Sequence, residues 1–223
     1  LTSQGDNWAN YASQAVCGSC HDAVDFSKHA GGQTDDSKCN SCHSTGGVAG
    51  SIQESHTILT EEARKRFAAQ ILAVTNTAPG QLPQVQYKVV DPTNDDMPYD
   101  LTTDPVWTAA GGASRLAIDL AWPTSDFTNT GNQREDASAV SLDALKGTPV
   151  GDGSYLVTST VPIPPVVADG SGLAGIEGHP AVNIGSDEKP DVQQIAFTNV
   201  HHFFSVNEPD GKPVPRRDSV DLT

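Results

Sequence analysis

Cysteine and basic residues are both scarce in this chain, and each shortage limits what the protein can be. The 223 residues include four cysteines, at positions 17, 20, 39 and 42, and residues 61–223 contain none, so no disulfide can form within that part. Lysine and arginine total 13 against 28 aspartates and glutamates, which gives a formal charge of −15. Phosphate-rich surfaces repel such an acidic chain, so we expect neither a nucleic-acid nor an anionic-membrane partner.

The sequence also lacks the apolar segments of membrane-spanning or newly made secreted chains. No apolar run approaches the length of about 20 residues that a helix needs to cross a bilayer. The chain begins with Leu1, and no basic and apolar signal segment precedes the cysteines. We therefore expect a mature or excised segment whose targeting information lies elsewhere.

All four cysteines fall in two copies of the pattern Cys-x-x-Cys-His. The copies are Cys17-Gly18-Ser19-Cys20-His21 and Cys39-Asn40-Ser41-Cys42-His43. Two thiols at this spacing can form thioethers to the two vinyl groups of one porphyrin, and the next residue places an imidazole on the iron. The pattern predicts two covalent haem c groups, with His21 and His43 as axial iron ligands.

Structural zinc is the main alternative for the same cysteines. Eighteen residues separate Cys20 from Cys39, which lies within the range of a four-cysteine zinc ribbon. The histidines distinguish the two cofactors, because chance would place one after both second cysteines roughly once in a thousand. A zinc ribbon uses neither histidine. The motif therefore favours haem, with zinc or two plain disulfides as the remaining alternatives.

His29 and His56 are the candidates for the second axial position of each iron. His29 follows His21 by eight residues and His56 follows His43 by thirteen, so both can reach an iron near the motifs. The alternative for each is a solvated loop histidine. Which of the two serves which iron stays open. Imidazoles on both sides leave no open position for a substrate, which favours one-electron exchange over inner-sphere catalysis.

Composition divides the chain into residues 1–60 and 61–223. The first part is rich in Gly, Ser, Cys, His and Asp and has few residues suited to a core, so it cannot bury enough apolar surface alone. Two porphyrins would supply the missing bulk, and glycines such as Gly31 and Gly32 would let the backbone approach them. We expect short helical turns around each motif, with loops between them.

Residues 61–223 show the alternation that is typical of β-strands. Val85, Tyr87 and Val89 alternate with polar residues, and the run ends at Asp91-Pro92. Similar runs cover residues 116–122, stopped by Pro123; residues 155–161, after the turn Gly151-Asp152-Gly153; and residues 194–206, where Ala196, Thr198, Val200, Phe204 and Val206 share a side. Strands with Gly-, Pro-, Asp- and Asn-rich connections predict a mainly β, Greek-key sandwich or partly open barrel.

One stretch remains ambiguous from its pattern. Thr60-Glu61-Glu62 could cap a helix with Ala63, Phe67 and Ile71 on one face, yet residues 67–74 could equally form a strand.

These features together resemble the OmcA/MtrC family of outer-surface multihaem c-type cytochromes from metal-reducing bacteria. The resemblance covers most of the chain. It is carried by the two Cys-x-x-Cys-His motifs, Phe26-Ser27-Lys28-His29-Ala30-Gly31-Gly32, Arg66-Phe67, Val89-Val90-Asp91-Pro92, residues 116–122, Gly178-His179-Pro180 and Arg216-Arg217-Asp218-Ser219-Val220-Asp221.

The resemblance implies a fold and a ligand set. The chain would comprise the last two haems of a pentahaem domain and the following Greek-key split β-barrel, with residues 67–74 as its first strand. Ligation would be bis-histidine, with His29 in the family's His-Gly-Gly region, where this chain inserts Ala30. Some relatives carry a cysteine pair in the barrel, and this chain has none there.

The resemblance also implies a setting and partners. The segment would lie on the extracellular face of the bacterial outer membrane and receive electrons from neighbouring haem domains and an outer-membrane conduit. It would pass them to ferric minerals, chelated metals or flavins, which is extracellular electron transfer in dissimilatory metal reduction. Terminal metal-reductase activity is implied by the resemblance alone, since the residues themselves predict an electron carrier.

Our leading hypothesis is therefore electron transfer through two bis-histidine haems in residues 1–60, followed by a β domain in residues 61–223. The alternative is a secreted β-sandwich binding or adhesion module with an N-terminal structural zinc or disulfide site.

Overall fold

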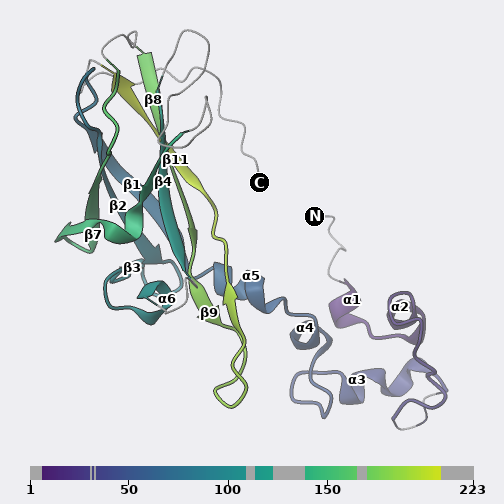
Figure 1. Ribbon diagram of the computed structural model, residues 1–223. Coiled ribbons are helices and arrows are strands. Elements are labelled where there is room, and N and C mark those ends of the chain that lie inside the picture. The colour runs from purple at the N-terminus through teal and green to yellow at the C-terminus, as the bar shows by residue number, and fades with distance from the viewer. Residues whose placement is uncertain are drawn as a thin grey trace. The chain divides into compact units, whose positions relative to one another are not determined.

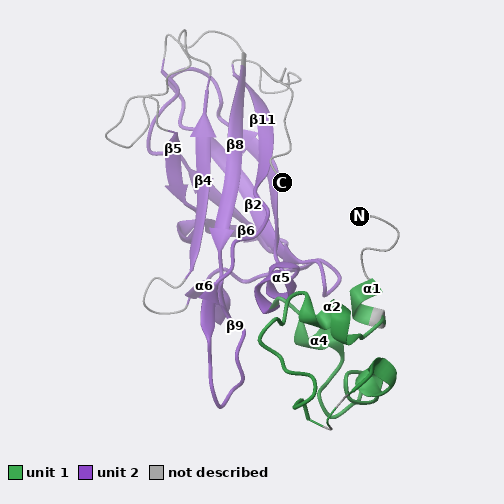
Figure 2. Ribbon diagram, turned by 90° about the vertical axis from the view of Figure 1, so that its right-hand side faces the viewer, with its two compact units in different colours: residues 1–58 green, residues 59–223 purple. Residues whose placement is uncertain are grey.

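The computed structural model describes residues 7–30, 32, 34–108, 114–122, 139–164 and 170–206. The chain divides into two units, residues 1–58 and residues 59–223, drawn in different colours in Figure 2. The boundary expected after residue 60 falls inside the first helix of the second unit, α5 (Leu59–Arg64). No helix among the described residues is long and apolar enough to cross a membrane.

The first unit consists of short helices joined by loops and turns, as the sequence predicts. Its helices are α1 (Asn7–Asn10), α2 (Gln14–Gly18), η1 (Asp36–Lys38), α3 (Cys39–Cys42) and α4 (Ile52–Ser55). Ile52 is the only buried apolar side chain that the described part of this unit contains. The unit therefore has almost no core of its own.

The second unit is a sandwich of two antiparallel sheets, seen from two directions in Figures 1 and 2. One sheet has the order β1-β2-β7-β6, with β3 also paired to β2, and the other has the order β11-β8-β4-β5. In the described residues no strand pairing joins the two sheets, so they form no closed barrel. The strands are β1 (Ala68–Thr75), β2 (Gln84–Asp91), β3 (Met97–Pro98), β4 (Arg115–Ala121), β5 (Val140–Asp143), β6 (Thr148–Gly151), β7 (Ser154–Thr158), β8 (Gly170–His179) and β11 (Val200–Val206).

Smaller elements complete this unit. They are α6 (Pro105–Thr108), η2 (Ala144–Lys146) and a two-stranded sheet of β9 (Ala181–Asn183) and β10 (Val192–Gln194). The core lies between the two large sheets and takes apolar side chains from both, among them Val85 and Val89 from β2 and Ile118 and Leu120 from β4.

Three of the predicted strands are confirmed. Val85, Tyr87 and Val89 are fully buried on β2, which ends at Asp91 as expected. Residues 115–121 form β4, and a hairpin joins β6 to β7 through the expected turn, with Asp152 at φ 51° and Gly153 at φ 69°. The strand predicted over residues 155–161 is shorter than expected, because β7 ends at Thr158. Pro123 and residues 216–221 lie outside the described residues.

The strand predicted over residues 194–206 is wrong in its first half. Residues 195–199 belong to no strand and separate β10 from β11. There Ile195 and Phe197 are buried while Ala196 and Thr198 are exposed, so the last two do not share a side with the buried Phe204 and Val206 as predicted. The N–H groups of Ile195 and Phe197 bond to the carbonyl oxygens of residues 180 and 178, so local pairing turns these two side chains inward.

The ambiguous stretch, residues 60–74, contains a helix followed by a strand. Helix α5 ends at Arg64, and β1 begins at Ala68 as the edge of its sheet. Phe67 lies between them and is buried against Tyr99, with ring centroids 5.1 Å apart.

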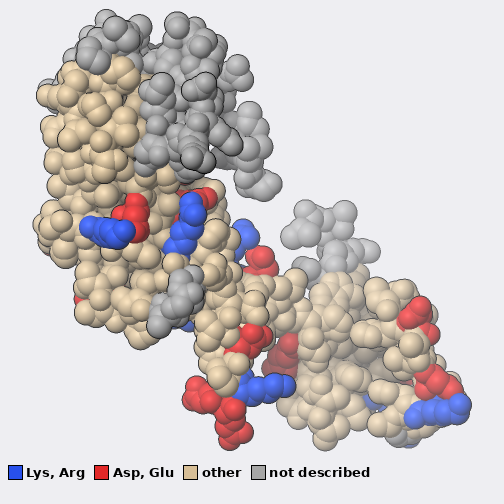
Figure 3. Space-filling model, viewed as in Figure 1, with Lys and Arg blue, Asp and Glu red and all other residues tan. Residues whose placement is uncertain are grey.

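Acidic and basic side chains form small mixed groups on the face of the molecule seen in Figure 3. The structure contains ion pairs such as Arg115 with Glu177, at 2.8 Å, and Lys146 with Asp143, at 3.0 Å. Exposed pairs of this kind contribute little to stability.

Candidate functional site

The first Cys-x-x-Cys-His motif forms a helical turn at the end of α2. Ser13 caps this helix, because its hydroxyl accepts a hydrogen bond from the N–H of Val16. The N–H of His21 then bonds to the carbonyl oxygen of Cys17 at 2.8 Å. A helical turn brings residues three and four apart to one side, so both thiols and the imidazole lie on neighbouring positions.

The second motif repeats this geometry in α3. The N–H of His43 bonds to the carbonyl oxygen of Cys39 at 3.0 Å, which matches the bond in the first motif. Asp35 caps the preceding turn η1 by accepting from the N–H of Ser37. The two motifs are also tied together, since the N–H of Gln14 donates to the Asp36 carboxylate at 2.8 Å.

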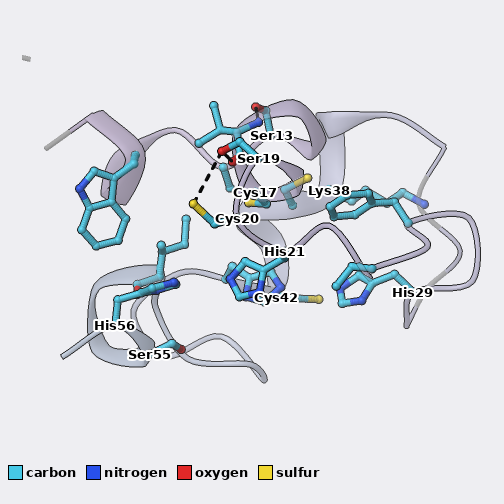
Figure 4. A pocket seen from close by; sticks show the side chains of 18 of the residues that line it. Ser13, Cys17, Ser19, Cys20, His21, His29, Lys38, Cys42, Ser55 and His56 are labelled. Carbon is cyan, nitrogen blue, oxygen red and sulfur yellow. Dashed lines mark hydrogen bonds between the residues drawn. The ribbon is translucent and has the colours of Figure 1, made fainter. Parts of the chain in front are cut away.

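A cavity of about 570 Å³ lies between the two motifs (Figure 4). Cofactor sites typically measure about 300–1,000 Å³. All four cysteines line it, and so do His21, His29, His43 and His56. The structure thus brings every residue proposed from the sequence for haem binding to one place.

Apolar side chains line the same cavity without filling it. Trp8, Val16 and Val24 are 40%, 45% and 39% exposed, although residues of these types are normally buried. Phe26 and Ile52 complete the apolar part of the wall. Because the unit has almost no other core, this lining fits a large flat apolar group such as a porphyrin.

The four histidines form two pairs across the cavity. His21 lies beside His56, with ring centroids 5.8 Å apart and the ring planes at 77°. His29 lies beside His43, with centroids 5.9 Å apart and planes at 13°. Two imidazoles on opposite sides of one metal, with bonds of about 2.0 Å as in zinc–histidine sites, would place their centroids about 6 Å apart. Both pairs match that spacing.

His56 is oriented by its own helix. Its Nδ1 lies 2.7 Å from the carbonyl oxygen of Ile52, and because a carbonyl only accepts, Nδ1 carries the proton and Nε2 keeps the lone pair. The helix is held by a capping box, in which the Ser51 hydroxyl accepts from the Glu54 N–H and the Glu54 carboxylate accepts from the Ser51 N–H. Such an outer hydrogen bond is typical of metal-binding histidines.

Two aromatic rings contact the histidines that follow no motif. Trp8 packs edge-on against His56 at 5.2 Å, and Phe26 packs edge-on against His29 at 6.4 Å. Sequence reasoning did not assign Trp8, Phe26 or the Ile52 carbonyl to the site. Trp8 is distant in sequence from His56, so no local pattern identifies it, whereas Ile52 lies four residues before His56 and the capping pattern of Ser51 and Glu54 could have identified its helix.

The described cysteines are arranged neither as a four-cysteine metal site nor as disulfides. No group of three or more Cys, His, Asp and Glu side chains converges as metal ligands among the residues that the structure describes. A zinc ribbon requires four such sulfurs at one point. No disulfide joins any of the four cysteines. Burial, aided by the charge of Asp36 and by Cys17, raises the pKa of the Cys39 thiol.

Comparison with known proteins identifies a solved structure with the same fold. A scan against protein families found no match, and a search of curated proteins found none. Among solved structures, the crystal structure of MtrC from Shewanella baltica OS185 matches 95% of this chain with a TM-score of 0.58 and 18% identity. The two share a fold. The MtrC-like fold accounts for the β-rich architecture, while this chain spans 35% of the length of that MtrC chain.

Proposed function

We propose that this chain is an electron-transfer segment of an extracellular multihaem cytochrome, with two haem c groups bound in residues 1–58. The observation that carries the proposal is the convergence of both Cys-x-x-Cys-His motifs and two additional histidines on one apolar cavity. The likeness to the fold of MtrC supports it independently, because that comparison covers 95% of the chain.

The cysteines and histidines have separate roles in this proposal. The thiols of each motif would hold one haem through thioethers, and His21 and His43 would bind the two irons. His29 and His56 would supply the second imidazole of each iron, and their ring spacings from His43 and His21 support this role. When bound, the two haems supply one-electron exchange at irons without an open coordination position.

The apolar wall and Lys38 would complete the binding site. Trp8, Val16 and Val24 line the cavity and would pack against the bound haems, which would shield the irons from water. Lys38, the basic side chain among those that line the cavity, supplies positive charge for a propionate.

The setting is part of the proposal. The segment lies on the extracellular face of the outer membrane and takes electrons from neighbouring haem domains of the full-length cytochrome, which an outer-membrane conduit supplies. It delivers them to ferric minerals, chelated metals or flavins. Mixing the reduced protein with chelated ferric iron or a flavin should reoxidise it, and haems that stay reduced with every acceptor would contradict this step.

The direct test is to count cofactors in the purified chain. Intact mass and a pyridine haemochrome assay should give two haems per chain, with a low-spin ferric spectrum. A mass with any other number of haems, or zinc in their place, would overturn the proposal.

A variant pair tests the second axial ligands. His56→Ala should open one coordination position, so that the reduced protein binds carbon monoxide at one haem while the unchanged chain binds none. His201→Ala is the matched control, because His201 is exposed on β11 and contacts Phe203 rather than the cavity. Carbon monoxide binding that is equal in all three proteins would exclude His56 as a ligand.

A further inference from the structure

The four histidines of the candidate haem site form two pairs of neighbouring rings. His29 and His43 form the inner pair, and His21 and His56 form the outer pair, whose sequence interval encloses the inner one. The two pairs have nearly the same ring spacing, 5.9 and 5.8 Å, but very different angles between their ring planes, 13° and 77°. The sequence alone does not determine this pairing.

We propose that the inner pair and the outer pair each ligate one iron, and that their ring angles make the two haems electronically different. This inference rests on the proposed function, since it requires that two haems are bound. It goes further by assigning each distal histidine to an iron and by giving each site a distinct spectroscopic signature.

The ring angle acts through the iron d orbitals. Each imidazole π system overlaps with the d orbital that lies perpendicular to its ring plane. Two rings at 13° overlap with the same one of two iron d orbitals, so the energies of these two orbitals become different. Two rings at 77° each overlap with a different one of the two orbitals, so the two orbital energies stay nearly equal. Near-equal orbitals retain more orbital angular momentum, which raises the highest g value of a low-spin ferric iron. The outer pair should therefore give the signal with the larger highest g value.

Contacts around the distal histidines hold these angles. His56 is fixed at Nδ1 by the Ile52 carbonyl oxygen, at 2.7 Å, and its ring meets the edge of Trp8 at 5.2 Å. His29 has Phe26 at its edge, with ring planes at 69°. A ligating ring that is restrained on its outer side keeps its orientation when iron binds. Trp8 and Phe26 are therefore positioning residues for the two irons.

Electron paramagnetic resonance of the ferric holoprotein tests the assignment after mass spectrometry has counted the haems. We expect two low-spin signals of equal intensity, one rhombic and one with a larger highest g value. His56→Ala should abolish the large-g signal alone, and His29→Ala should abolish the rhombic signal alone. His201→Ala should change neither. Two identical signals, or loss of the rhombic signal in His56→Ala, would overturn the inference.

Motif variants keep the pairing testable if a distal variant folds poorly. His21→Ala should remove the large-g signal, whether the first haem is lost or only its ligand changes, and His43→Ala should remove the rhombic one. If His21→Ala and His29→Ala remove the same signal, the pairing is wrong. A chain with fewer than two haems before any substitution contradicts the proposed function instead, so the two failures are distinguishable.

A third pair of variants tests the positioning role of Trp8. Trp8→Ala should lower the highest g value of the large-g signal and leave the rhombic signal and the haem count unchanged. Trp8→Phe restores an aromatic edge and should return the large-g signal toward its original position. An unchanged spectrum in Trp8→Ala would show that Trp8 does not set the angle of the His56 ring.

Discussion

At the scale of single residues, Tyr87 shows how a buried polar group supports the sandwich. Its side chain is fully buried, and its hydroxyl donates a hydrogen bond to the carbonyl oxygen of Ala144. Tyr87→Phe should lower the free energy of unfolding by about 1–3 kcal/mol, because the buried carbonyl loses its partner. Urea unfolding measures this loss. Tyr11→Phe, at a side chain that is 68% exposed, is the control and should change stability by less than about 0.5 kcal/mol.

A second buried tyrosine, Tyr99, should make the free energy of unfolding depend on pH in the alkaline range. Burial, followed by the charge of Asp91, raises the pKa of Tyr99 to about 12, above the usual value of about 10. Between these values the folded chain keeps a proton that the unfolded chain has lost, so the free energy of unfolding falls as pH rises through this window.

Urea unfolding at about pH 9 and about pH 11 measures the fall, which begins as the pH passes the unfolded pKa. Tyr99→Phe should reduce the fall without abolishing it, since burial also raises the pKa of Tyr87 and of Tyr155. An equal fall in both proteins would exclude Tyr99 as a contributor.

At the scale of elements, β8 depends on glycines at its inward-facing positions. The ring of Phe204, on the paired strand β11, occupies the space where a Cβ on Gly172 would lie. Gly172→Ala should therefore cost about 1–3 kcal/mol in urea unfolding, the usual cost of overpacking a core. Gly175→Ala on the same strand has no atom within 4 Å of the new Cβ and is the matched control. Equal losses would show that backbone freedom, rather than packing, explains the glycines.

Strand β8 also shows why some elements escape sequence reasoning. Its sequence is rich in glycine, which weakens a strand, and it lacks the alternating large apolar residues that identified β2 and β4. It is nevertheless an interior strand of its sheet, between β11 and β4. The apolar bulk over its glycines comes from Phe204 and Phe197, which belong to another part of the chain. A pattern confined to one segment cannot reveal packing that another segment supplies.

At the scale of the whole molecule, the two units should respond differently to loss of the proposed haems. The unit of residues 59–223 has an extensive core, whereas Ile52 is the only buried apolar side chain in the described part of the first unit. If the proposed haems are bound, replacing all four cysteines with serine should therefore unfold residues 1–58 and leave the sandwich folded, because the chain would lose the apolar surface that the haems supply.

Hydrogen exchange read by mass spectrometry measures this difference segment by segment. Amides of α2, α3 and α4 should exchange freely in the quadruple variant, while β2, β4 and β8 should stay as protected as in the holoprotein. Full protection of the first unit without haem would contradict the prediction, and equal loss in both units would show that they fold as one.

The sequence by itself determined the chemistry of the candidate site and the β-rich class of the fold. Cysteine spacing and the following histidine are local properties, and alternation along β2 and β4 is local too, so both can be read from neighbouring residues. The tertiary structure alone decided which of His29 and His56 lies beside which motif histidine, and which aromatic side chain contacts each of these two rings. These relations join residues that are distant in sequence, and only packing in three dimensions brings His21 to His56 and His29 to His43.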